Sequence, residues 1–226
     1  MVPQHIAFSE YSAGTDIEKK YAPKDLYYMG DFSLLRTGKR VSVVGSRNAS
    51  THGLKRAEII TKELVKKGFV VVSGLASGID TMAHRTAIDH GGKTIAVVGT
   101  SLEQVYPKEN TSLFNEIASD HLVISQFPND YPFQKKNFPM RNQTMALISD
   151  ATIIIEAKEK SGTRHQGWEA LRLGRRLLIM ENIVNDPEMT WPKEMLNYGA
   201  EVLTRENMDF LLTDIPYLTE QEDIVF

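Results

Sequence analysis

The sequence contains no cysteine and no long apolar run. Without cysteine the chain can form no disulfide, no thiolate metal ligand and no cysteine nucleophile. No apolar stretch approaches the length that spans a bilayer, and the first ten residues lack the basic-then-apolar order of a signal peptide. We therefore expect a cytoplasmic protein without a membrane segment.

A strongly basic charge is also missing, because the net charge is −3 at pH 7. This argues against a globally basic nucleic-acid-binding protein, but it permits a local basic groove. The composition is that of a globular chain with one sizeable core. We expect a main domain at residues 40–203, a lead-in segment at 1–39 that packs on it, and a C-terminal helix and tail at 204–226.

Apolar β-branched runs alternate with helical patterns along most of the chain. Strands and helices that alternate through short Gly-containing turns predict right-handed βαβ units. The predicted fold is therefore α/β, an extended Rossmann-like, doubly wound and mainly parallel sheet, with ligands beyond the carboxyl ends of the strands. Strands are expected at 41–45, 69–73, 94–99, 122–125, 151–156 and 176–180, and helices at about 51–67, 80–90, 108–118, 141–148, 163–173 and 206–212.

A glycine-containing turn follows the second expected strand. It begins at Ser73 and Gly74, passes through Gly78 and leads into a helix with Asp80 as its expected N-cap. Glycines let a backbone come close to a ligand, and the free N–H groups at a helix start favour an anion such as phosphate. The alternative is that both glycines serve the turn alone.

Two other strand ends carry residues suited to phosphate. Gly45, Ser46 and Arg47 follow the first strand, with Ser50 close behind, and Ser161-Gly162-Thr163 follow the fifth. Arginine offers a planar fork of donors that fits a phosphate, and serine hydroxyls add hydrogen bonds. Because these junctions meet at one edge of the sheet, they favour a nucleotide or phosphate site there.

Basic residues, amides and an aromatic ring are interleaved before the fifth strand, at Lys135, Lys136, Phe138, Arg141 and Asn142. This pattern suits single-stranded nucleic acid, because cations meet phosphates while an aromatic face stacks on any base. The alternative is a solvated loop around a core phenylalanine.

Common catalytic and cofactor motifs are missing. No G-x-G-x-x-G follows a strand, and Gly91-Gly92-Lys93-Thr94 leads into a strand where a P-loop requires a helix. His84 and His90 are six residues apart on different sides of a helix, which disfavours a metal site. No serine stands in a G-x-S-x-G elbow. We expect no metal, no cofactor and no catalytic residue.

The motifs in their order resemble those of the DprA/Smf family. They are G-S-R at 45–47, S-G-L-A-S-G-I-D-x-x-A-H at 73–84, Y-P-x-E-N at 106–110, F-P-x-R-N at 138–142 and S-G-T at 161–163. The resemblance runs from about Tyr21 to about Met180. It implies an extended Rossmann fold and a homodimer that binds single-stranded DNA, protects it and loads the recombinase RecA during DNA uptake, without catalysis.

By position in the motifs, the resemblance implies that Arg47 binds DNA and that Lys135 or Lys136, Phe138 and Arg141 line the same groove. The full set of expected DNA- or phosphate-binding residues is Gly45, Ser46, Arg47, Ser50, Ser73, Gly74, Gly78, Lys135, Lys136, Phe138, Arg141, Asn142, Ser161, Gly162 and Thr163.

Two alternatives remain open. The stretch from Ser161 to Glu169 is vaguely similar to a motif of nucleotide phosphoribohydrolases with a related fold, in which Glu169 would act on a nucleoside monophosphate. The other alternative is a sensor that binds a small nucleotide without turnover.

Overall fold

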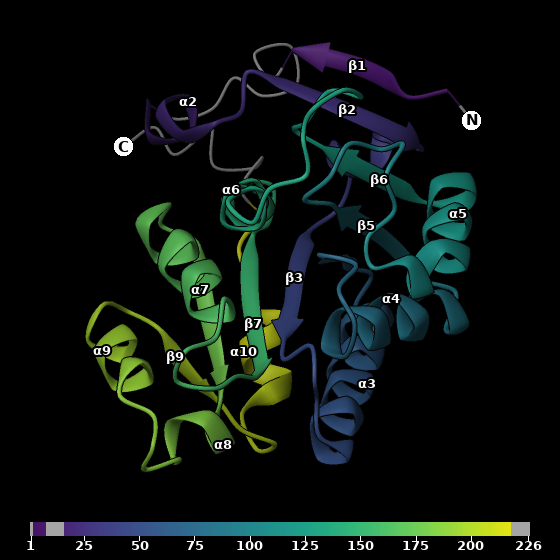
Figure 1. Ribbon diagram of the computed structural model, residues 1–226. Coiled ribbons are helices and arrows are strands. Elements are labelled where there is room, and N and C mark those ends of the chain that lie inside the picture. Colours follow the sequence, from purple (N-terminus) through teal and green to yellow (C-terminus); the bar gives the residue numbers. More distant parts are fainter. Residues whose placement is uncertain (1, 8–15, 218–226) are drawn as a thin grey trace, which may run out of the picture.

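The computed structural model describes residues 2–7 and 16–217. Within these residues one sheet has nine strands in the order β1-β2-β6-β5-β4-β3-β7-β8-β9 (Figure 1). β2 pairs antiparallel with both β1 and β6, and every other neighbouring pair is parallel. The strands are β1 Gln4–Ala7, β2 Asp25–Gly30, β3 Arg40–Gly45, β4 Val70–Ser73, β5 Lys93–Val97, β6 Leu122–Ser125, β7 Ala151–Glu156, β8 Arg176–Met180 and β9 Glu201–Leu203.

Helices lie on both sides of the central strands, with α3, α4 and α5 to the right and α6, α7 and α9 to the left in Figure 1. Central strands covered on both faces become continuous apolar runs, and β3 and β7 are accordingly buried along nearly their whole length. The helices are α2 Asp16–Tyr21, α3 Thr51–Lys66, α4 Ile79–Asp89, α5 Thr111–Asp120, α6 Asn137–Leu147, α7 Thr163–Arg172, α8 Glu181–Val184, α9 Trp191–Asn197 and α10 Met208–Thr213, with 3₁₀ turns at Phe32–Leu35 and Lys108–Asn110.

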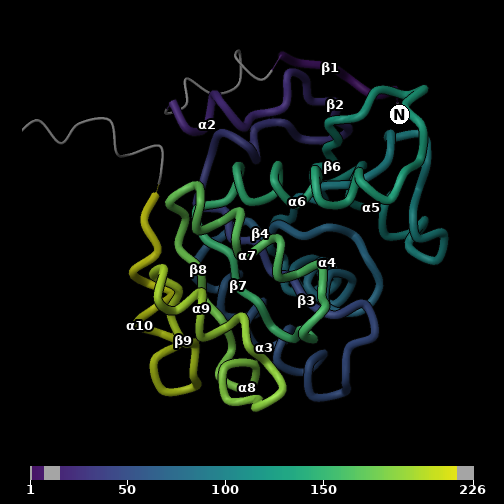
Figure 2. The backbone as a smooth tube through the Cα atoms, turned by 60° about the vertical axis from the view of Figure 1, so that its left-hand side comes forward, coloured from purple at the N-terminus to yellow at the C-terminus, as the bar shows by residue number. Residues whose placement is uncertain are grey.

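The lead-in segment contributes strands to the sheet itself. β2 pairs with β6 and carries the fully buried Leu26, while β1 forms the outer edge. Figure 2 shows β1 and β2 at one end of the molecule, with β9 and α10 at the other. Residues 8–15 of the expected lead-in and 218–226 of the expected tail lie outside the described residues.

The doubly wound, mainly parallel α/β sheet predicted from the sequence is confirmed, with two corrections near its carboxyl edge. The helix expected from Arg141 begins four residues earlier, at Asn137. Asp80 is not the N-cap of α4, because Gly78 occupies that position with a φ of 77°. A positive φ strains residues with a side chain, so glycine is favoured there. Among the described helices, none combines the length and apolar character needed to cross a membrane.

Candidate functional site

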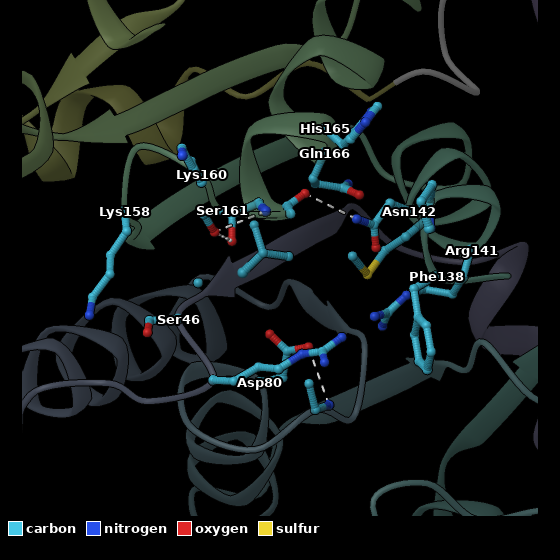
Figure 3. Close-up of a pocket in the computed structure, with 18 of the residues that line it drawn as sticks. Ser46, Asp80, Phe138, Arg141, Asn142, Lys158, Lys160, Ser161, His165 and Gln166 are labelled. Atoms are coloured by element: carbon cyan, nitrogen blue, oxygen red, sulfur yellow. Dashed lines mark hydrogen bonds between the residues drawn. The ribbon is translucent and has the colours of Figure 1, made fainter. Parts of the chain in front are cut away.

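A pocket of about 460 Å³ opens beyond the carboxyl ends of β3 and β7 (Figure 3). The chain leaves β3 through α3 to reach β4 on one side, whereas β7 lies on the other side of β3. Such a reversal of strand order is the usual ligand position in open α/β sheets. The pocket therefore lies at the edge where the sequence predicts a ligand.

Four chain segments converge on this pocket: the turn after β3, the turn before α4, the first half of α6, and the turn from β7 into α7. The expected site residues that line it are Gly45, Ser46, Arg47, Phe138, Arg141, Asn142, Ser161, Gly162 and Thr163. The expected residues that do not line it are Ser50, Ser73, Gly74, Gly78, Lys135 and Lys136.

Arg47 and Phe138 form a single unit at the mouth of the pocket. Arg47 is exposed, and its guanidinium carbon lies 5.2 Å from the centre of the Phe138 ring. A cation over an aromatic face at this distance is attracted by the ring quadrupole. A further part of the ring packs against Gly99, where a side chain would come within 2.8 Å of it. Phe138 therefore supports the arginine in addition to offering a surface to a ligand.

Arg141 and Asp80 form the floor of the pocket. Arg141 is only 5% exposed and Asp80 6%. Nη1 of Arg141 donates to the Val97 carbonyl over 3.1 Å, while its Nε has no hydrogen-bond partner in the structure. Burial lowers the pKa of Arg141 and raises the pKa of Asp80, and their mutual attraction opposes both shifts. Arg141 therefore lies at the base of the pocket with little exposed surface, and its contact with DNA stays a prediction.

The two glycines of the turn before α4 lie close against other parts of the protein. A side chain at Gly74 would overlap the guanidinium of Arg141, and one at Gly78 would lie 2.6 Å from the Arg47 carbonyl. The Gly74 N–H also donates to Asp80 over 3.2 Å. These contacts fit the open alternative, that the glycines serve the turn, and the interpretation that they bring the backbone close to a phosphate stays a prediction.

Two expected serine contacts are engaged inside the protein. Ser73 is fully buried, and its hydroxyl donates to the Val43 carbonyl over 2.7 Å. Ser50 is the N-cap of α3, because its Oγ accepts from the Gly53 N–H, and it also bonds to Glu156. Because Ser73 has no exposed surface in this structure, its burial disfavours a contact with DNA, which stays a prediction. Ser50 has its hydroxyl committed to the cap.

The turn from β7 into α7 supplies two lysines that were not among the expected site residues. Lys158 and Lys160 line the pocket and are exposed, and the same holds for His165 in the first turn of α7. Figure 3 shows Lys158, Lys160 and Ser161 on the side of the pocket opposite Phe138 and Arg141. The sequence contains a pattern that indicates these lysines: a Lys-x-Lys pair stands just after a strand that ends at this edge of the sheet.

Lys135 and Lys136 are exposed immediately before α6, outside the pocket lining. Whether they contact DNA stays a prediction. Glu169, the residue on which the phosphoribohydrolase alternative depends, also lies outside the lining and pairs with Arg172 one helical turn away. The alternative therefore lacks its catalytic carboxylate at this pocket.

The charge of the pocket is opposite to that of the chain. Arg47, Arg141, Lys158 and Lys160 line it against a single acidic residue, Asp80. A concave surface lined by one sign of charge concentrates ligands of the opposite sign. In the part of the chain that the structure describes, no three His, Asp or Glu side chains are grouped to hold a metal.

These features define the chain as a Rossmann-like α/β protein with a basic pocket at the switch point of its sheet. The family model of DNA recombination-mediator protein A matches residues 5–214, and the chain belongs to that family. The resemblance to DprA/Smf proteins inferred from the motifs is thereby confirmed.

Individual relatives agree with this assignment. The chain is 36% identical over 181 residues to DNA processing protein DprA of Bacillus subtilis, covering 80% of this chain but 61% of the relative. The structure of DprA from Streptococcus pneumoniae aligns with a TM-score of 0.81 at 34% identity, over 95% of this chain and 75% of that one. The structure of DNA processing protein A of Helicobacter pylori was solved to describe its single-stranded DNA binding mode. It aligns with a TM-score of 0.79 at 28% identity, over 95% of this chain and 97% of that one.

Proposed function

We propose that this chain binds single-stranded DNA across the pocket at the carboxyl edge of its sheet. The observation that carries the proposal is the convergence of exposed Arg47, Lys158 and Lys160 around a cavity that Phe138 borders. Exposed cations attract phosphates, and an aromatic ring offers a stacking surface that accepts any base. The single-stranded DNA binding of the Helicobacter pylori relative supports the choice of ligand.

The shape of the site favours a single strand over a duplex. A volume of about 460 Å³ lies within the range of small-ligand pockets, so it has room for one base but not for stacked base pairs. The cations Arg47 and Lys158 are exposed at the opening, whereas the floor is formed by buried Arg141. A base can then enter while its phosphates stay at the opening, which requires that the base is unpaired.

The proposal includes a non-catalytic role, because the residues that line the pocket offer no nucleophile paired with a base. From the family resemblance we also propose that the protein works in the cytoplasm as a homodimer, protects single strands and hands them to the recombinase RecA. These are activities of whole proteins, and the chain spans 61% of the length of its Bacillus subtilis relative. They rest on the family resemblance and not on the pocket.

Binding of a small nucleotide without turnover remains a second candidate, favoured by the match between the pocket volume and one nucleotide. The two functions differ in how affinity depends on strand length. A DNA-binding site gains affinity as phosphates are added, whereas a nucleotide sensor binds a nucleoside monophosphate as well as a longer strand.

Fluorescence anisotropy with labelled oligo-dT and with a duplex of equal length tests the proposal. We expect binding to the single strand that weakens as salt rises, weaker binding to the duplex, and no competition from a nucleoside monophosphate at equal concentration. Release of free base from the monophosphate would instead support an enzyme. Equal affinity for monophosphate and oligonucleotide would support the sensor.

A further inference from the structure

Three aromatic rings contact one another beside the pocket. The ring centres of Tyr106 and Phe133 are 5.1 Å apart, those of Tyr106 and Phe138 are 5.7 Å apart, and those of Phe133 and Phe138 are 5.8 Å apart. Tyr106 follows β5, while Phe133 precedes α6. Segments distant in sequence thus place two more rings next to the ring that borders the pocket.

Tyr106 and Phe133, which we call the aromatic shelf, are largely exposed. Tyr106 is 44% exposed and Phe133 47%. Large apolar side chains that lie together at the surface commonly mark a binding site. Phe138 is half-buried and connects the shelf to the pocket.

The shelf is continuous with the DNA site. A small recess of about 40 Å³ between Tyr106 and Phe138 shares Arg47, Phe138 and Arg141 with the larger pocket. This recess is too small to admit a base. A ligand on this side must therefore lie on the outer faces of the rings, while one on the other side of Arg47 can enter the pocket.

We propose that the aromatic shelf extends the DNA site, so that bases next to the one in the pocket stack on Tyr106 and Phe133. This inference rests on the proposed function. The occupant is the same single strand, because the shelf continues from Arg47 and Phe138 and because exposed Lys135 and Lys136 follow Phe133 closely. Alternation of cations with exposed rings is the arrangement that binds a strand without sequence preference.

The test compares the wild-type protein with the Tyr106→Ala/Phe133→Ala variant on oligo-dT of about four and about twelve nucleotides, lengths within the range of single-strand site sizes. The variant should bind the short strand like the wild type and the long strand roughly tenfold more weakly. Its salt dependence should stay unchanged, because no cation is removed.

The matched control is Tyr198→Ala/Phe210→Ala, which removes two rings that are 68% and 69% exposed and lie on other elements. It should bind both strands like the wild type. The single substitution Phe133→Leu, which keeps apolar bulk without a ring, should reproduce part of the length-dependent loss and serves if the double variant does not fold.

Unchanged affinity of the double variant and of Phe133→Leu for the long strand would overturn the shelf while leaving the pocket in place. An equal loss on both strands would also overturn it, since the rings would then act on the pocket. A lower molar mass of the variant by light scattering, with DNA binding intact, would assign the shelf to a contact between copies instead. No binding of either strand by the wild type would overturn the proposed function itself.

Discussion

The floor and the rim of the pocket both carry charged side chains, but those of the floor are buried and those of the rim are exposed. The floor consists of Asp80 and Arg141, which are buried and flank Gly74. The rim consists of Arg47, Lys158 and Lys160, which are exposed. Burying a charge costs several kcal/mol unless a partner compensates it, whereas an exposed charge contributes little to stability.

This difference separates residues that build the site from residues that are free to bind. The Asp80 carboxylate accepts hydrogen bonds from the N–H groups of Gly74 and Ala76, which fixes the turn before α4. It also attracts Arg141, which lies on α6, and so helps to position that helix. The rim cations can change partners at little cost. Substitutions in the floor should therefore affect folding first, and substitutions at the rim should affect binding and its salt dependence.

Asp80→Ala should have the largest effect. It leaves the buried Arg141 without its compensating charge and removes two acceptors from the turn, so the free energy of unfolding should fall by about 3–5 kcal/mol. Urea unfolding measures this loss. The control Asp89→Ala, on the exposed end of the same helix, should stay within about 0.5 kcal/mol of wild type. Equal stability of the two variants would remove the distinction between floor and rim.

Acid should lower the free energy of unfolding in a defined pH range, because the buried His84 has to stay neutral in the folded protein. Burial lowers the pKa of His84 to about 3 in the folded protein, whereas the same side chain in the unfolded chain has a pKa near 6.5. Because the unfolded state then binds more protons, the stability contributed by neutral His84 is complete above about pH 6.5 and declines by about 1.4 kcal/mol per pH unit toward pH 3. Urea unfolding at several pH values should show a shallower decline in His84→Gln. The same decline in both proteins would contradict the assignment to His84.

Phe138→Leu should weaken binding with a smaller effect on folding. Loss of a ring that stacks on a base costs about 1–3 kcal/mol of binding free energy. Because Phe138 also supports Arg47, the losses from Phe138→Leu and Arg47→Ala should not add. A double-mutant cycle by anisotropy measures this coupling. Additive losses would show that the arginine does not depend on the ring.

Replacement of both Lys158 and Lys160 by alanine should weaken single-strand binding and flatten its salt dependence, with almost no effect on folding. Each lost phosphate contact flattens the plot of log affinity against log salt by roughly 0.7 for a single strand. The free energy of unfolding should stay within about 0.5 kcal/mol of wild type. The control Lys66→Ala alters an exposed lysine in the last turn of α3, outside the pocket lining, and should leave the slope unchanged. If the double variant and Lys66→Ala had the same slope, Lys158 and Lys160 would not contact the DNA.

The sequence predicts where the site lies better than it predicts which of its side chains are buried, and the reason is physical. Strand ends such as Val41–Gly45 are visible as β-branched runs that stop at glycine, and the residues that follow them gather at one edge. The register of α6 was not visible, because its first turn contains a proline and polar residues that are typical of a loop. With the helix beginning at Asn137, Arg141 falls on the buried face together with Thr144 and Met145.

The edge strands were missed for a different reason. β1 and β2 are short and lack a clear alternation of apolar and polar residues. β2 depends on antiparallel pairing with β6, and β1 depends on pairing with β2, which no local pattern reveals. β9 has three residues and depends on β8 in the same way. The burial of Ser73 and the close packing of Gly74 were not visible either, because a glycine turn that packs against the protein has the same sequence as one that holds a ligand.

The salt dependence of single-strand binding by Arg47→Ala tests the central claim most directly. Arg47 is exposed at the rim and lines both the pocket and the recess beside the aromatic shelf. The account predicts a protein that unfolds like the wild type and binds oligo-dT more weakly, with a slope of log affinity against log salt that is flatter by roughly 0.7. A folded variant with wild-type affinity and wild-type slope would place the DNA elsewhere and contradict the account.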